Sequence, residues 1–159
     1  MNKRAIIKKI TAKLADELEL YFRAAQFARA EATHEQNKAE HKYDTRGLEA
    51  SYLAHGQSRQ AAELETAIRE FEKLDGHPLA AGEAIALGAL VELEHSGEKT
   101  LYFLGPRAGG TEVIHDRKEI LVITPQSPLG EQLLGKQQGD RPQLNLGGVP
   151  QPAHILRVE

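Results

Sequence analysis

The sequence predicts an α+β fold in which an N-terminal antiparallel coiled-coil hairpin precedes a small β-rich domain. Residues 3–75 contain no proline and only two glycines, whereas all seven prolines and the other twelve glycines follow. Because proline and glycine interrupt helices, this change in composition separates a helical segment from one rich in turns. We therefore expect two domains, residues 1–75 and residues 76–159.

The spacing of apolar residues in the first segment predicts two helices that pair along one seam. The intervals are mostly three and four, which is a heptad-like pattern. The seam residues are Ile7, Ile10, Leu14, Leu18, Tyr21, Ala25, Ala28 and Ala32, and then Ala54, Gln57, Ala61, Leu64, Ile68 and Phe71. In antiparallel pairing, facing residue numbers add to a nearly constant value, which places the turn near His41 and the tip near residues 35–47. Each helix then has about 30 residues and spans about 45 Å.

The second segment shows short apolar or alternating runs that predict strands. We expect strands at residues 89–94, 100–104, 120–124 and 154–158, with Ser96-Gly97 as a tight turn between the first two. Gly105-Pro106 and Gly109-Gly110 predict a loop. That loop lacks the strand–loop–helix context of a phosphate-binding loop, so we interpret it as a turn.

Composition limits the classes of function. The chain has 159 residues, 27% of them charged and 5% aromatic, with a formal net charge of -3. A chain without excess positive charge is a poor generic binder of nucleic acid, so any such role should run through another protein. The absence of cysteine excludes disulfides and thiolate metal sites. No run predicts a membrane span or a signal peptide, so we expect a cytoplasmic protein.

Residues 127–140 form the most distinctive stretch, with the sequence SPLGEQLLGKQQGD. Ser127-Pro128 is typical of a helix start, because serine caps the first turn and proline at the first helical position loses no hydrogen bond. We expect Leu129, Leu133 and Leu134 to share one face of this helix, and Gly135 to end it. Gly139-Asp140 predicts a turn into the last strands.

This stretch resembles the C-terminal signature of the bacterial Gre transcript-cleavage factors, roughly S-P-[IL]-[GA]-x-x-L-[IL]-G-K-x-x-G-D. The matching residues that we single out are Ser127, Pro128, Gly135, Lys136, Gly139 and Asp140. The resemblance implies an FKBP-like C-terminal domain and a hairpin that enters the secondary channel of bacterial RNA polymerase. It also implies a factor that is not an enzyme itself, contacts nucleic acid only through the polymerase, and has no membrane role. We expect it to be a monomer.

The tip is where a Gre-like function would be decided. In cleavage-stimulating members the tip is roughly G-D-L-x-E-N-A-E-Y, and its acids help to hold a Mg²⁺ ion at the polymerase's catalytic centre. By resemblance, Glu40 and Asp44 are the main candidates here and Glu35 is a weaker one, while Tyr43 and Arg46 are candidates for contact with the channel or the RNA. Carboxylates suit Mg²⁺ because it is a hard ion that prefers oxygen ligands.

The tip of this chain departs from the family string. Glu40 and Asp44 are four positions apart rather than three, and Lys38, Lys42 and Arg46 are interleaved with them. A cation beside a carboxylate lowers its pKa but competes with a metal for it. We therefore expect no stable metal site or cofactor of the chain's own, only a Mg²⁺ shared with the polymerase through Glu40 and Asp44.

Two versions of the Gre-like hypothesis follow: the tip stimulates transcript cleavage, or it occludes or modulates the polymerase active site. The broken acidic string favours the second.

The alternative from another class is a coiled-coil interaction or dimerisation protein whose FKBP-like domain is a scaffold. Prolyl isomerase activity is a weaker idea, since few aromatic residues are available for a pocket. A zinc site at His34, His41 and His55 lacks the usual short ligand spacing, so surface positions are the better interpretation.

Overall fold

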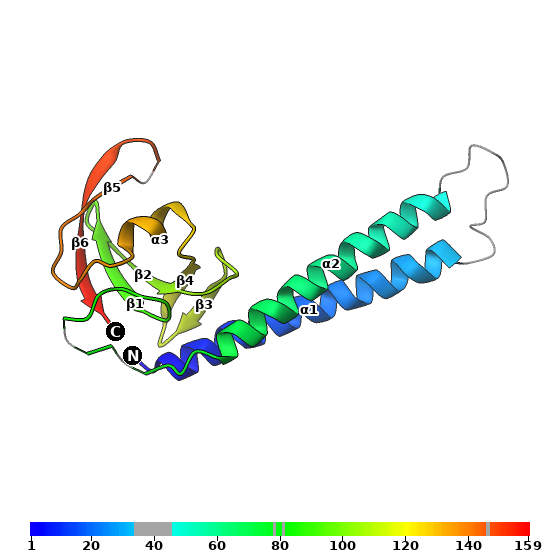
Figure 1. Ribbon diagram of the computed structural model, residues 1–159, viewed down its shortest axis with the longest axis horizontal. Helices are drawn as coiled ribbons and strands as arrows, with labels where there is room; N and C mark the ends of the chain where they lie inside the picture. Colours follow the sequence, from blue (N-terminus) through cyan, green and yellow to red (C-terminus); the bar gives the residue numbers. More distant parts are fainter. Residues whose placement is uncertain (34–45, 78, 81, 146) are drawn as a thin grey trace. The chain divides into compact units, whose positions relative to one another are not determined.

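A computed structural model describes residues 1–33, 46–77, 79–80, 82–145 and 147–159, with the side chains of residue 32 and residues 46–54 left undescribed. Two long helices, α1 (Lys3–Thr33) and α2 (Arg46–Glu72), precede a β-rich region that contains one short helix (Figure 1). This order confirms the predicted fold class. In the part of the chain described here, no helix is long and apolar enough to cross a membrane.

Contacts divide the chain into two compact units. The hairpin unit comprises Lys13–Ile68, and the β unit comprises Met1–Ala12 together with Arg69–Glu159. The first turns of α1 and the last turn of α2 thus pack with the β-rich domain, as one body. The domain boundary that composition predicts between residues 75 and 76 stays a prediction about sequence organisation.

Burial in the helices follows the predicted seam. In the hairpin unit the side chains of Leu14, Ala25, Ala28 and Ala61 are buried, and Ala67, which was not assigned to the seam, is buried as well. Leu18, Tyr21, Leu64 and Ile68 are half-buried. The buried residues become smaller along α1, from Leu14 to Ala25 and Ala28. Small side chains allow the two helices to approach closely, which keeps this part of the hairpin narrow.

The β unit contains a six-stranded sheet in the order β3-β4-β2-β1-β6-β5. The strands are β1 (Leu90–His95), β2 (Glu98–Leu104), β3 (Glu112–His115), β4 (Lys118–Ile123), β5 (Gln143–Asn145) and β6 (Pro150–Val158). All neighbours are antiparallel except β2 and β4, which are parallel. The turn between β1 and β2 lies at Ser96 and Gly97, both with positive φ, as the sequence predicts.

Four of the six strands correspond to predicted runs, with shifted ends. The last strand starts at Pro150 rather than at residue 154, and β2 starts at Glu98 rather than at residue 100. The two edge strands, β3 and β5, were not predicted. They are only four and three residues long, EVIH and QLN, which is too short for an alternating pattern to be recognised.

The sheet has apolar residues packed on both faces. The core on one face lies between the sheet and the short helix α3 (Pro128–Leu133), as Figure 1 shows. Its buried residues are Ile85, Ala89, Val91, Leu93, Leu104, Ile123, Leu133, Leu144, Ala153 and Ile155. Phe103 alternates with Tyr102 and Leu104 along β2 and therefore points to the opposite face. There its ring lies 6.1 Å from that of Phe71, centroid to centroid, at the base of α2.

Candidate functional site

The predicted tip residues cannot be placed. Glu35, Glu40, Tyr43 and Asp44 lie outside the described residues, as does the predicted turn centre at His41. Arg46 is the first residue of α2, but its side chain is not described. The candidate metal and polymerase contacts at the tip therefore stay predictions.

The residues at the start of the Gre-like motif build a capped helix, as predicted. Ser127 has extended backbone angles, and its Oγ accepts a hydrogen bond from the Gly130 amide at 3.1 Å while donating to the Thr124 carbonyl at 2.7 Å. Pro128 occupies the first turn of α3. A Cβ on Gly130 would lie 1.9 Å from the Thr124 carbonyl oxygen, so only glycine fits where α3 crosses the end of β4.

The end of the short helix is tied to the segment before β1. Gly135 has a φ of +79° and ends the helix in the left-handed conformation, as predicted. Its amide donates to the Ile85 carbonyl at 2.9 Å, and the Ile85 amide donates to the Lys136 carbonyl at 2.7 Å. These two hydrogen bonds fix the helix end against a segment some fifty residues earlier in the chain.

One prediction about this helix is wrong. Leu133 is fully buried and Leu129 half-buried, but Leu134 is 48% exposed. The helix ends at Leu133, and Leu134 has a ψ of 131° as its C-terminal cap. The side chain of Leu134 therefore leaves the face that a continued helix would have given it.

The last part of the motif anchors the turn to the final strand. The Asp140 carboxylate accepts from the Gln137 amide at 2.8 Å, which closes a small loop around Gly139. The Gly139 amide donates to the Ile155 carbonyl at 2.8 Å, and the Ile155 amide donates to the Asp140 carbonyl at 2.9 Å. The hydrogen bonds described for this motif are internal to the β unit, so they shape that domain.

The base of α1 is held to the β unit by lysine side chains. Lys3 Nζ donates to the Gly88 carbonyl at 3.2 Å, and Lys9 Nζ donates to the Ile114 carbonyl at 2.6 Å. Lys3 is only 5% exposed, and burial lowers the pKa of its ammonium group below the ordinary 10.5. The nearby carboxylates, Asp75 first among them, oppose this shift of the pKa.

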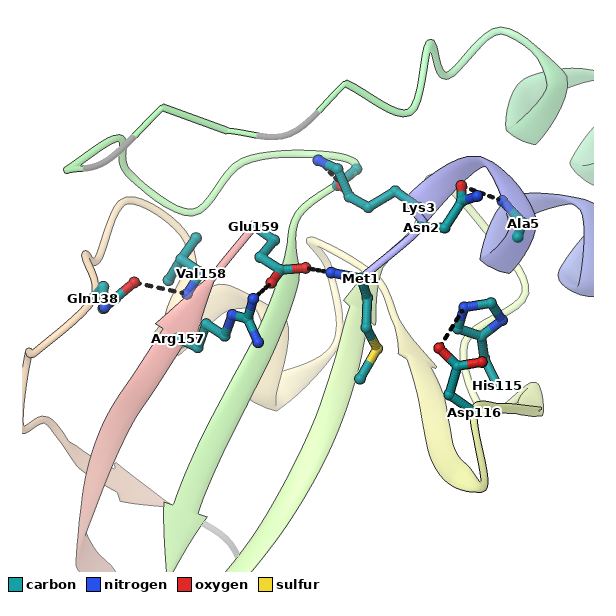
Figure 2. A network of polar contacts seen from close by, with 11 residues as sticks. Met1, Asn2, Lys3, Ala5, His115, Asp116, Gln138, Arg157, Val158 and Glu159 are labelled. Atoms are coloured by element: carbon teal, nitrogen blue, oxygen red, sulfur yellow. Dashed lines mark hydrogen bonds and ion pairs between the residues drawn. The ribbon is translucent and has the colours of Figure 1, made fainter.

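The two ends of the described chain meet in the same region. Figure 2 shows Glu159 between the Met1 amine and the Arg157 guanidinium, with both of which it forms ion pairs. Glu159 also exchanges backbone hydrogen bonds of 2.8 and 2.9 Å with Leu90 at the start of β1. Together with Lys3, these contacts fix the first turn of α1 relative to the central strands.

An exposed loop between α2 and the β-rich domain carries one perturbed carboxyl group. The His77 amide donates to Asp75 Oδ1 at 3.0 Å, and this hydrogen bond lowers the pKa of the Asp75 carboxyl group. The Asp75 carbonyl in turn accepts from Arg4 Nε at 3.2 Å. This arrangement orders the connection rather than forming a reactive centre.

The described residues contain no group of three or more histidine or acidic side chains that could hold a metal ion. Of the three histidines considered for zinc, His55 is exposed on α2, and His34 and His41 lie outside the described residues.

Sequence reasoning missed several residues that shape the β unit. Lys3 carried no signal, because a lysine in a basic N-terminal run is normally a surface residue. The sequence predicts only a loop at Gly105, yet an added Cβ there would lie 2.6 Å from the Phe71 ring. Gly130 was part of the motif but was not singled out; the signal was a small residue two positions after Ser-Pro.

Solved structures that are similar to this chain include members of the Gre family. The GreA factor homolog 1 (Gfh1) of Thermus thermophilus is 26% identical, with 94% of each chain covered and a TM-score of 0.39. Gfh1 of Thermus aquaticus is 25% identical, covering 96% of this chain and 95% of its own, with a TM-score of 0.41. A transcription elongation factor GreA/GreB from Nitrosomonas europaea is 19% identical over 70% of this chain and 91% of its own, with a TM-score of 0.36. No family model and no curated protein matches.

The chain resembles the Gre factors. Because the TM-scores are low, this resemblance rests on the fourteen-residue motif and on the order of the hairpin and the β-rich domain along the chain. The Gre-like motif folds into a capped helix, a glycine stop and a closed turn, which are the local structures that its residues predict.

Proposed function

We propose that this chain is a Gre-like transcription elongation factor that binds bacterial RNA polymerase through its secondary channel. The observation that carries the proposal is the motif at residues 127–140, in one chain with a long helical hairpin. A capped helix or a hairpin alone is common and would not indicate a function. The joint occurrence of both is what favours this family of functions over others.

The geometry of the hairpin suits insertion into a channel. Helices α1 and α2 have 31 and 27 residues, which correspond to lengths of about 45 and 40 Å at 1.5 Å per residue. Alanines at the buried positions Ala25, Ala28 and Ala61 permit close helix packing and hence a narrow cross-section. A long, narrow hairpin with a charged tip can carry that tip to a site that a globular domain cannot enter.

The proposal assigns the chemistry to the polymerase rather than to this chain. Glu40 and Asp44 would act on a Mg²⁺ ion that the polymerase holds, and Lys38, Lys42 and Arg46 would weaken that action by pairing with them. We therefore favour a factor that occludes or modulates the active site over one that stimulates cleavage. Such a factor acts in the cytoplasm, as a monomer without an active site of its own.

The deciding experiment adds the purified protein to stalled, backtracked elongation complexes with Mg²⁺ and follows both transcript length and elongation rate. Modulation predicts slower elongation or displacement of a cleavage-stimulating Gre factor, without shortened transcripts. Shortened transcripts that disappear in Glu40→Ala and Asp44→Ala would instead establish cleavage stimulation.

A matched control comes from the β unit. Glu98 and Glu119 are exposed on β2 and β4, so the double change Glu98→Ala and Glu119→Ala removes the same charge as Glu40→Ala with Asp44→Ala. An effect common to both double variants would reflect net charge rather than the tip. Absence of polymerase binding by the unmodified protein would contradict the proposal altogether.

The alternative is a coiled-coil interaction or dimerisation protein. The exposed apolar side chains of Leu20 and Phe27 on α1 are the observation that keeps this alternative open. A dimer formed through the hairpin would cover the surface that must enter a channel. Sedimentation of the full chain distinguishes the two, since the channel-binding proposal requires a monomer at working concentrations.

A further inference from the structure

The outer side of α1 carries an apolar stripe, made of Leu20, Ala24 and Phe27. Leu20 is 67% exposed and Phe27 is 73% exposed, and Ala24 between them is exposed as well. Leu20 and Phe27 are seven positions apart, which is about two helical turns, so their side chains lie on the same side of the helix about 10 Å apart along the axis.

The stripe faces away from the seam of the hairpin unit. The buried or half-buried seam positions Tyr21 and Ala28 each directly follow a residue of the stripe. Successive residues in a helix are rotated by about 100°, so Leu20 and Phe27 point well to one side of the seam. Pairing of α1 along its seam therefore leaves the stripe uncovered.

Exposure of these side chains does not serve the helix itself. Phenylalanine is a poorer helix former than the charged residues that occupy most exposed positions here. Large apolar side chains that share one exposed surface of a helix indicate a contact with a partner. The stripe lies between Asp16 and Glu17 on one side and Glu31 on the other, while the neighbouring Arg23 is paired with Glu19.

The area of the stripe decides which partner fits. A stable, specific dimer buries about 800 Å² per partner, whereas an aromatic side chain such as that of Phe27 contributes no more than about 150–250 Å², and the smaller side chain of Leu20 contributes less. A second copy of this chain that docked on the stripe alone would therefore bury too little surface for a stable dimer. A partner that surrounds the hairpin would obtain the remaining area from other sides.

We propose that the stripe of Leu20, Ala24 and Phe27 docks on an apolar patch of the polymerase channel wall, bordered by basic side chains that face Asp16 and Glu17. This inference rests on the proposed function and adds to it the side of the hairpin that meets the wall. Docking along one side of α1 fixes the rotation of the hairpin about its own axis. It therefore determines which tip side chains are turned toward the polymerase active site.

The test compares the double change Leu20→Gln and Phe27→Gln with the single change Phe22→Gln. Phe22 is 46% exposed on the same helix, but it lies about 200° around the axis from Leu20 and belongs to another side. Glutamine is a good helix former, so all variants should retain their helical circular dichroism. Binding of each full-length variant to core polymerase is measured by fluorescence titration, and self-association by sedimentation velocity.

We expect the double change to weaken polymerase binding about tenfold, as loss of a buried anchor at an interface does. Phe22→Gln should change the affinity by less than about twofold. If the unmodified protein binds and all variants bind equally well, the stripe is not the docking side, although the proposed function stands. If the double change converts a dimer of the unmodified protein to a monomer, the occupant is a second copy and the inference is wrong. If the unmodified protein does not bind polymerase, the proposed function fails and this inference fails with it.

Discussion

The two units of this molecule are stabilised in different ways. In the β unit, large side chains such as Phe71, Phe103 and Ile155 are fully buried on the two faces of a sheet. In the hairpin unit, most of the described side chains that are buried belong to alanine, and Leu20 and Phe27 are exposed. Burial of large side chains therefore stabilises the β unit. The stability of the hairpin unit depends more on helix formation, and much of its surface is exposed to solvent.

Substitutions of Phe71 in the β unit and Phe27 in the hairpin unit test this difference most directly. Phe71→Ala should destabilise the protein by about 3–5 kcal/mol, because it opens a cavity against Phe103. Phe27→Ala should change the free energy of unfolding by no more than about 0.5 kcal/mol, because the ring is 73% exposed and alanine favours the helix. Urea unfolding followed by circular dichroism measures both. Similar losses in the two variants would show that the hairpin unit has a packed core of its own.

A glycine-to-alanine substitution should destabilise the β unit but stabilise the hairpin unit. A Cβ at Gly130 would lie 1.9 Å from the Thr124 carbonyl oxygen, whereas nothing lies within 4 Å of a Cβ at Gly56 in α2. Gly130→Ala should therefore cost about 3 kcal/mol through overpacking, while Gly56→Ala should stabilise its helix by about 0.5–1 kcal/mol. Thermal unfolding of the two variants tests this pair. A gain from Gly130→Ala would contradict the close approach of α3 to the end of β4.

The smallest expected effect is a pH dependence that belongs to the β unit. Burial lowers the pKa of Lys3 in the folded state below the ordinary 10.5 of the unfolded chain. Between those two pKa values the unfolded state binds more protons, so stability from this group rises with pH. The slope cannot exceed about 1.4 kcal/mol per pH unit for one group.

The measurement is urea unfolding at a series of alkaline pH values for the unmodified protein, Lys3→Met and Lys8→Met. Lys8 is exposed and lies about one turn further along α1, so Lys8→Met should keep the slope of the unmodified protein. Lys3→Met should lose the rising contribution. Parallel profiles for all three proteins would mean that the Lys3 ammonium is solvated in the folded state.

Local sequence was sufficient for the elements whose signal is local. The helices follow from the spacing of seam residues such as Leu14, Ala25 and Ala61, which are buried as predicted. The helix start at Ser127-Pro128 and the stop at Gly135 follow from capping chemistry within a few residues. Such patterns act over one or two turns of chain, so no distant partner is needed to predict them.

The two edge strands could not be predicted from local sequence. Strands β3 and β5 form because β4 and β6 offer unpaired edges, and their own short sequences do not specify a strand. The parallel pairing of β2 with β4 also depends on how the chain crosses over, with β3 placed outside both. Pairing partners are chosen by the assembled sheet rather than by propensity.

The sequence by itself determined the two-part architecture, the seam of the hairpin and the capped helix of the motif, because each depends on residues close together in the chain. Only the tertiary structure decided that Lys3 is buried, that Gly130 admits no side chain and that Leu134 is exposed. These outcomes depend on which distant atoms occupy the neighbouring space: the Gly88 carbonyl at Lys3 and the Thr124 carbonyl at Gly130. Burial and steric limits are properties of the packed chain, and residue type alone does not reveal them.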